Sequence, residues 1–377
     1  MTNRKPAEVF PPGDFLLEEL EIRGWTQVDL AEILGRPPMV VNSIVKGKRS
    51  ITPETAKGIA EAFGTSAEYW LRLEAAYQLS KIGDPDDSVG RRAVLYAKAP
   101  VKELCRRNWI EYSDNVDVLE SRLCNFLRIE TLEDDPVVFA HAARKSTPYD
   151  SSTPSSQVVW LLRAQQLAST LDVVPYSRNN FKPTIRKLVK LLHAVEEVRQ
   201  VPRILSDAGI RFLVIEQTQG SKIDGACFWL DENSPVVVVS LRHDRIDNFW
   251  HTVMHELGHV ANEDGLNSNA SLDIDLYSSG PEGKPQFEKD ADLFAVETLV
   301  PQKALKEFIG RVGPLYSRNR VIGFAALHNI HPAIVIGQLQ HQGELQYSQF
   351  RNLMQKSRNH VNQVVLTDGW KSALPAL

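Results

Sequence analysis

The pentapeptide HELGH at residues 255–259 constrains this sequence more than any other feature. It lies in the apolar, periodic segment NFWHTVMHELGHVANED, which predicts a helix. Residues four apart share one face of a helix, so His255 and His259 would present two imidazoles to one metal ion, with Glu256 beside them. In a chain with ten histidines, this pattern arises by chance with a probability of roughly one or two per cent. The motif therefore predicts a zinc site in which Glu256 is the general base for hydrolysis.

A catalytic zinc site needs a third protein ligand and one open position. Eight carboxylates downstream are available: Glu263, Asp264, Asp273, Asp275, Glu282, Glu288, Asp290 and Asp292. Most lie in a turn-rich loop that would hold a ligand poorly, whereas Glu288 lies at the start of the helical run FEKDADLFAVETLVP. Asp292, one turn later, could accept a hydrogen bond from the outer nitrogen of a ligating histidine. Glu288 is therefore the favoured third ligand for Zn²⁺, with Asp292 behind the ligands.

Other polar residues are candidates for supporting roles. His251 lies four residues before His255, and as a fourth ligand it would close the site around a structural metal. A position beside the ligands or in solvent is favoured for it. Candidates for the group that stabilises the oxyanion are Tyr277, His328 and His331. The sequence does not choose among these three.

The hydrophobic period changes at Gly209. The runs IRFLVIE, GACFWL and PVVVVSL are short, rich in β-formers and bounded by turn residues, which predicts strands. Helical patterns follow, so residues 201–377 are expected to form an α+β domain. The last run is a candidate edge strand that would pair with an extended substrate backbone.

The N-terminal 80 residues predict short helices separated by turns. Thr26 precedes QVDLAEIL as a helix cap, the tight turn GRPP follows, and MVVNSIVK forms a second helix. Two short helices across such a turn are typical of a helix-turn-helix, whose second helix enters the major groove of DNA. The alternative is a small helical bundle that serves only in dimerisation, which the slight excess of acids in this module favours.

Charge within this module favours DNA binding. No acid lies between Glu32 and Glu54, whereas several bases do, and these are candidates for phosphate contacts. Asn42 and Ser43 can form hydrogen bonds with base edges. The full set of predicted DNA-contacting residues is Gln27, Arg36, Met39, Asn42, Ser43, Lys46, Lys48 and Arg49.

Residues 81–200 read as a linker followed by a helical connector. The stretch KIGDPDDSVGRR is rich in turn formers, and helices are predicted over 101–109, 116–126, 157–168 and 183–198. No motif assigns this region a role. A spacer, a dimer interface and a toxin-binding surface fit its pattern equally well.

Composition excludes several classes of protein. The net charge of −4 means that nucleic-acid binding requires a locally basic face. Three widely spaced cysteines provide neither a disulfide framework nor a CxxC metal pair. With no apolar run of about 18 residues and no secretory signal at the N-terminus, we expect a cytoplasmic protein that has no membrane contact.

The N-terminal module resembles the XRE-type helix-turn-helix of HigA-like antitoxins, which belongs to the lambda-repressor-like fold. The resemblance covers about 65 residues, from PPGDFLLEEL through VNSIVKGKRSITPETAKGIAEAFGTSAEYWL. It implies binding of operator DNA as a homodimer, and repression of an operon that also encodes a toxin partner.

The C-terminal region resembles the ImmA/IrrE family of metallopeptidases, which are zincin-like. The resemblance is carried by HELGH, by E-x-x-A-x-x-F-A about 30 residues later and by the Leu-Val-Pro that follows. It implies that Glu288 is the third zinc ligand. Members of this family commonly cleave a partner transcriptional repressor, whereas others that are fused to helix-turn-helix modules have no established substrate.

Together these patterns indicate a multidomain regulator with an all-α helix-turn-helix domain, a helical connector and a metallopeptidase domain. In one interpretation it cleaves a regulatory protein on a signal. In a second it is a HigA-like antitoxin or autorepressor whose peptidase-like domain binds a toxin or ligand without cleavage. In a third it is a peptidase with an appended dimerisation module.

Overall fold

The computed structural model describes residues 9–82, 87–136, 155–264, 266, 271–274 and 286–369. The chain divides by its contacts into two compact units, Met1–Gly90 and Arg91–Leu377. This division differs from the three regions seen in the sequence pattern, because the connector's described residues from Arg91 onward belong to the larger unit.

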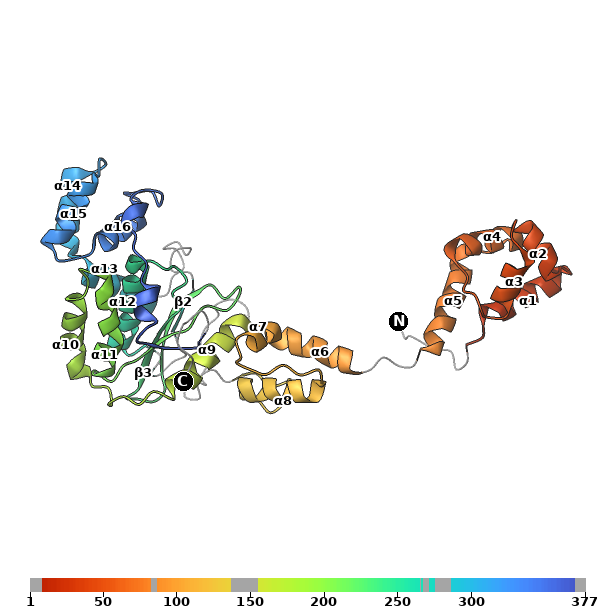
Figure 1. The fold of residues 1–377 in the computed structure, drawn as a ribbon, viewed down its shortest axis with the longest axis horizontal. Coiled ribbons are helices and arrows are strands. Elements are labelled where there is room, and N and C mark those ends of the chain that lie inside the picture. The colour runs from red at the N-terminus through yellow and green to blue at the C-terminus, as the bar shows by residue number, and fades with distance from the viewer. Residues whose placement is uncertain are drawn as a thin grey trace. The chain divides into compact units, whose positions relative to one another are not determined.

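The smaller unit consists of helices joined by short turns in its described residues. Its helices are α1 (Pro12–Arg23), α2 (Gln27–Ile33), α3 (Pro38–Val45), α4 (Pro53–Phe63) and α5 (Ala67–Lys81), and α6 (Asp87–Lys98) begins before the boundary (Figure 1). Thr26 and Asp29 form a reciprocal capping box at α2, and Thr52 and Ser66 cap α4 and α5. Leu30, Ile44, Ile59 and Trp70 lie in one buried core. The all-α fold predicted for this region is confirmed.

The larger unit is built on a mixed sheet of five described strands. These are β1 (Arg211–Val214), β2 (Ile223–Trp229), β3 (Pro235–Val239), β4 (Ser271–Ile274) and β5 (Leu366–Thr367), in the order β4-β2-β3-β1-β5. Strand β3 pairs in parallel with β1 and antiparallel with β2. The prediction that PVVVVSL is an edge strand is therefore wrong: both of its edges are paired, as a continuous apolar run buried on both faces indicates.

Helices cover both faces of this sheet. Val237 and Val239 lie in a core shared with the long helix α12 (Ile246–Asn262), whereas Val236 and Val238 lie in a core shared with α7 (Val101–Arg106), α8 (Val116–Leu127) and α9 (Ser155–Ala168). This alternation follows from the two-residue period of a strand. The predicted helices at 101–109, 116–126 and 157–168 thus form one covering layer of the sheet.

The remaining helices contribute side chains to the core that contains α12. They are α10 (Arg178–Val189), η1 (Val195–Gln200), α11 (Val201–Ser206), α13 (Gln286–Leu299), α14 (Gln302–Val312), α15 (Arg318–Leu327), α16 (Pro332–His341), η2 (Arg351–Leu353) and α17 (Arg358–Val361). Of these, α13 and α16 pack directly on α12. Helix α10 differs from the predicted span 183–198, because it encloses Pro183 and ends at Val189. Burial of Phe181, Thr184 and Leu188 holds it in place despite the proline.

Among the described residues, no single helix is long and apolar enough to cross a membrane. Helices α15 and α16 reach the required length and composition only as a pair, and that pair is bent by 112°.

Candidate metal centre and nucleic-acid interface

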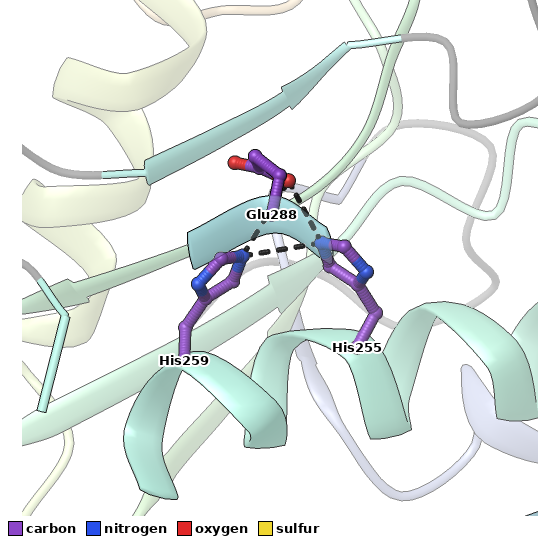
Figure 2. Close-up of side chains that lie close together, drawn as sticks. All are labelled: His255, His259 and Glu288. Carbon is purple, nitrogen blue, oxygen red and sulfur yellow. Dashed lines mark hydrogen bonds and ion pairs between the residues drawn. The ribbon is translucent and has the colours of Figure 1, made fainter. Parts of the chain in front are cut away.

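Helix α12 places two histidines of the HELGH segment on one face, as their spacing predicts. The Nε2 atoms of His255 and His259 lie 3.1 Å apart, and both side chains are fully buried (Figure 2). Glu288, in the first turn of α13, directs Oε2 to within 3.2 Å of His255 Nε2 and 3.7 Å of His259 Nε2. The three side chains converge from two helices that are far apart in the sequence. They form a group whose donor atoms all lie within 4.8 Å of one another.

A glycine explains how α13 approaches α12 so closely. A Cβ atom at Gly258 would lie 2.9 Å from the Cα of Ala291 and 3.3 Å from its Cβ. Such a contact is too short for the two backbones to keep their positions. The glycine of HELGH therefore permits the helix crossing that carries Glu288 to the two histidines.

The outer nitrogen of each histidine faces a carboxylate. Asp292 Oδ1 lies 3.0 Å from His255 Nδ1, at the position expected from its place one turn after Glu288. Asp264 Oδ2 lies 2.9 Å from His259 Nδ1. Sequence reasoning considered Asp264 only as a ligand and missed this position, which depends on the left-handed residue Glu263 that turns the chain back at the end of α12. Carboxylates behind ligating histidines orient the rings and increase their basicity.

Electrostatics within the cluster favour positive charge. Burial lowers the pKa of His259, but its hydrogen bonds with Asp264 and Glu288 outweigh burial and raise that pKa to about 9. Burial raises the pKa of Glu288, but its hydrogen bonds with His255 and His259 outweigh burial and lower that pKa to about 2. The cluster thus contains an ionised carboxylate that attracts positive charge, which a divalent cation supplies when the imidazoles are neutral.

The donor set fits zinc. Two imidazole nitrogens and one carboxylate oxygen are a ligand set of catalytic zinc sites, and they leave a fourth position for water or substrate. Burial of all three side chains and the carboxylates behind both rings match the surroundings of such sites.

Glu256 is fully buried and lies against the sheet. A Cβ atom at Gly225 of β2 would lie 2.5 Å from Glu256 Oε1, so the absence of a side chain at Gly225 makes room for this carboxylate. Burial, with Glu256 as the next contributor, raises the pKa of the nearby Cys227 thiol well above its usual value. All three cysteines are free, as the sequence predicts.

The other residues considered from the sequence lie in several places. The rings of His251 and His255 have centroids 6.3 Å apart, and His328 packs on Phe324. His331 accepts a hydrogen bond from the backbone N–H of Ala333 and caps α16. Residues that lie outside the described part of the chain, or whose side chains do, are Asp273, Asp275, Tyr277 and Glu282.

In the smaller unit, α2 and α3 form the helix-turn-helix pair. The Asn42 amide donates a hydrogen bond to the Gln27 carbonyl oxygen at 3.1 Å, so two predicted DNA contacts support one another. Ser43 donates its hydroxyl proton to the backbone oxygen of Met39, whose side chain is 79% exposed. Arg36 pairs with Glu54 at 3.0 Å. Three other predicted DNA contacts are Lys46, Lys48 and Arg49. All three are exposed, and none forms an ion pair with another described residue.

Comparison with known proteins identifies both units. Residues 16–70 match the family described as Helix-turn-helix, and residues 206–314 match the family described as IrrE N-terminal-like domain. The second match includes His255, His259 and Glu288. The fold and the site thus define a protein that carries a helix-turn-helix domain of the DNA-binding class and a metallopeptidase-like domain on one chain. The chain belongs to the helix-turn-helix family and carries an IrrE N-terminal-like domain.

Individual relatives match the smaller unit. The chain is 38% identical over 85 residues to virulence-associated protein I of Dichelobacter nodosus, an overlap of 22% of this chain and 76% of that protein. It is 36% identical over 80 residues to the HTH-type transcriptional regulator YbaQ of Escherichia coli K12, an overlap of 21% and 68%. Among solved structures, an addiction module antidote protein of a HigA family from Coxiella burnetii is 41% identical, with a TM-score of 0.18, over 19% of this chain and 77% of that one.

Proposed function

We propose that this protein is a cytoplasmic transcriptional regulator that binds operator DNA as a homodimer and cleaves a regulatory protein with a zinc-dependent peptidase site. The observation that carries the proposal is the convergence of His255, His259 and Glu288 in a buried site with a carboxylate behind each histidine. The membership of the smaller unit in the helix-turn-helix family supports the DNA-binding part.

Each residue of the site has a defined task in this proposal. His255, His259 and Glu288 would hold Zn²⁺, which when bound polarises a carbonyl and lowers the pKa of water. Glu256 accepts the proton of the attacking water and later delivers it to the leaving amine. Asp292 and Asp264 keep the two imidazole rings oriented.

The sheet offers a place for an extended substrate. Strand β4 is at one end of the described strands, next to β2, which carries Gly225 against Glu256. An extended peptide that added to the sheet beside β4 would lie along the edge nearest the candidate site. This position replaces the one predicted for PVVVVSL.

The smaller unit would read DNA through α3. Asn42, held by Gln27, is directed to base edges, while Lys46, Lys48 and Arg49 contact phosphates. A homodimer would read two half-sites about 34 Å apart, one helical turn of DNA.

The test of the peptidase is Glu256→Gln, which preserves the size of the side chain and removes the base. We expect hydrolysis of a pool of quenched fluorescent peptides to fall by about 10²–10⁴-fold, with zinc content and DNA affinity unchanged. The matched control is Glu297→Gln at an exposed position on α13, which leaves the rate unchanged. Zinc-loaded wild-type protein that cleaves no peptide contradicts the proposal and favours an antitoxin or autorepressor whose larger unit binds a toxin or ligand without cleavage.

A further inference from the structure

The larger unit carries a basic array on α10 that neither the metal centre nor the helix-turn-helix uses. Residues 173–195 contain five lysines and arginines and no acid, although the chain as a whole has a net charge of −4. The basic residues are Arg178, Lys182, Arg186, Lys187 and Lys190, and all five are exposed. This is a local excess of positive charge in an otherwise acidic protein.

Helical spacing arranges four of these residues in a row. Arg178, Lys182, Arg186 and Lys190 follow one another at intervals of four, so they lie along one side of the helix. The buried residues Phe181 and Thr184 lie on the other side, in contact with the body of the unit. The row spans 12 residues, which at 1.5 Å per residue is about 18 Å.

The charges of the array remain available for a partner. Only Arg178 has an ion pair among the described residues, with Glu263 at 3.1 Å, and that pair is largely exposed. Lys182, Arg186, Lys187 and Lys190 have no carboxylate within ion-pair distance in the described part of the chain. The packing of Phe181 on Phe294 of α13 fixes the helix that carries them.

We propose that this array binds the phosphate backbone of duplex DNA as a second, sequence-independent contact of the same chain. Double-stranded DNA carries one phosphate charge about every 1.7 Å along its axis, so a row about 18 Å long can reach several phosphates at once. The row itself consists only of lysine and arginine, which are the side chains that contact phosphates.

DNA is the favoured polyanion because the smaller unit on the same chain is a helix-turn-helix domain. This step rests on the proposed DNA binding by that unit. Once the smaller unit is on DNA, the larger unit is held near the same duplex at a high effective concentration. Weak contacts by α10 then add to the affinity of the whole chain.

The test uses the full chain and a labelled mixed-sequence DNA duplex about 30 base pairs long, titrated between roughly 50 and 200 mM salt. The variant Lys182→Gln/Arg186→Gln/Lys187→Gln/Lys190→Gln removes four charges. We expect the slope of log affinity against log salt to become shallower by roughly 3 to 4, and affinity at low salt to fall on the order of tenfold or more.

A matched control removes the same number of exposed charges from α14 and α15, as Lys303→Gln/Lys306→Gln/Arg311→Gln/Arg320→Gln. We expect the control to keep most of the wild-type slope. An equal loss in both variants assigns the effect to net charge and overturns the proposal. An unchanged slope in the α10 variant also overturns the proposal. A third contrary result comes from the same titration with polyglutamate in place of DNA: an α10 variant that loses binding to polyglutamate but keeps its binding to DNA indicates an acidic protein partner.

The variant Lys46→Ala/Lys48→Ala separates this inference from the proposed function. If the smaller unit does not bind DNA, Lys46→Ala/Lys48→Ala has the DNA affinity of wild type, while the α10 variant still has a lower affinity and a shallower salt slope. If α10 does not bind DNA, the α10 variant has the wild-type affinity and Lys46→Ala/Lys48→Ala has the lower one.

Discussion

The two candidate sites of this protein differ in how they are held. In the smaller unit, Met39 on α3, Lys46 at its C-terminal cap and Lys48 in the turn that follows are exposed, and their positions depend only on that helix and its turn. In the larger unit, His255, His259 and Glu288 are buried, and they meet because α12 and α13 pack closely. The surface site can therefore be altered without loss of the fold. In the buried site, a substitution that changes the packing of α12 against α13 also moves the candidate ligands.

The largest effect that tests this comparison is expected at Gly258. In Gly258→Ala the new methyl group would meet the backbone of Ala291, so α13 must shift and Glu288 with it. We expect the free energy of unfolding to fall by about 1–3 kcal/mol and zinc affinity to fall with it. Chemical denaturation and a competitive zinc titration measure the two effects.

The matched control is Gly310→Ala in α14, where a Cβ atom would meet nothing within 4 Å. It should leave zinc affinity unchanged and stabilise the helix by up to about 1 kcal/mol. If both substitutions behave alike, close packing between α12 and α13 does not hold the site.

A smaller effect is expected from the carboxylates behind the histidines. Asp264→Ala removes the hydrogen bond to His259 Nδ1 but no ligand atom, so zinc affinity should fall by about 10–100-fold. A competition titration with a zinc chelator of known affinity measures this. Asp290→Ala, at an exposed residue of α13, is the control and should bind as wild type does. If Asp264→Ala binds zinc as tightly as wild type does, Asp264 does not orient the His259 ring for metal binding.

The smallest effect on the fold is expected in the smaller unit. Lys46→Ala/Lys48→Ala should weaken DNA binding uniformly across sequences and make the salt slope shallower by about 2. The free energy of unfolding should stay within about 0.5 kcal/mol of wild type, because these side chains lie on the surface. Anisotropy with labelled DNA and denaturation by urea give the two values. A large loss of stability would break the contrast between the two sites.

Local sequence signals were sufficient for the helix-turn-helix pair, the HELGH helix and three strands of the sheet. The cap at Thr26 predicted the start of α2, because a cap depends on residues only three positions apart. The apolar runs IRFLVIE, GACFWL and PVVVVSL correctly predicted the strands β1, β2 and β3. The meeting of Glu288 with the two histidines was also predicted, since a rigid helix was the best carrier of a third ligand; its role in binding zinc stays a prediction.

Sequence reasoning failed where the contact partner is distant along the chain. The central place of β3 depends on pairing with β1 and β2, and the short strands β4 and β5 have too few residues for a pattern of their own. The packing of α7, α8 and α9 against the sheet was not predicted, because an apolar helix face fits any buried surface. Asp264 was misjudged because its position depends on the turn at Glu263 rather than on spacing along α12.

The central claim is that the buried cluster of the larger unit holds zinc. The most direct measurement is the zinc content of the purified protein by elemental mass spectrometry, for wild type, His255→Ala and, as a control away from the cluster, His193→Ala. We predict about one zinc per chain in wild type and in His193→Ala, and none in His255→Ala. Wild-type protein without zinc after supplementation, or His255→Ala with full zinc, would contradict the claim.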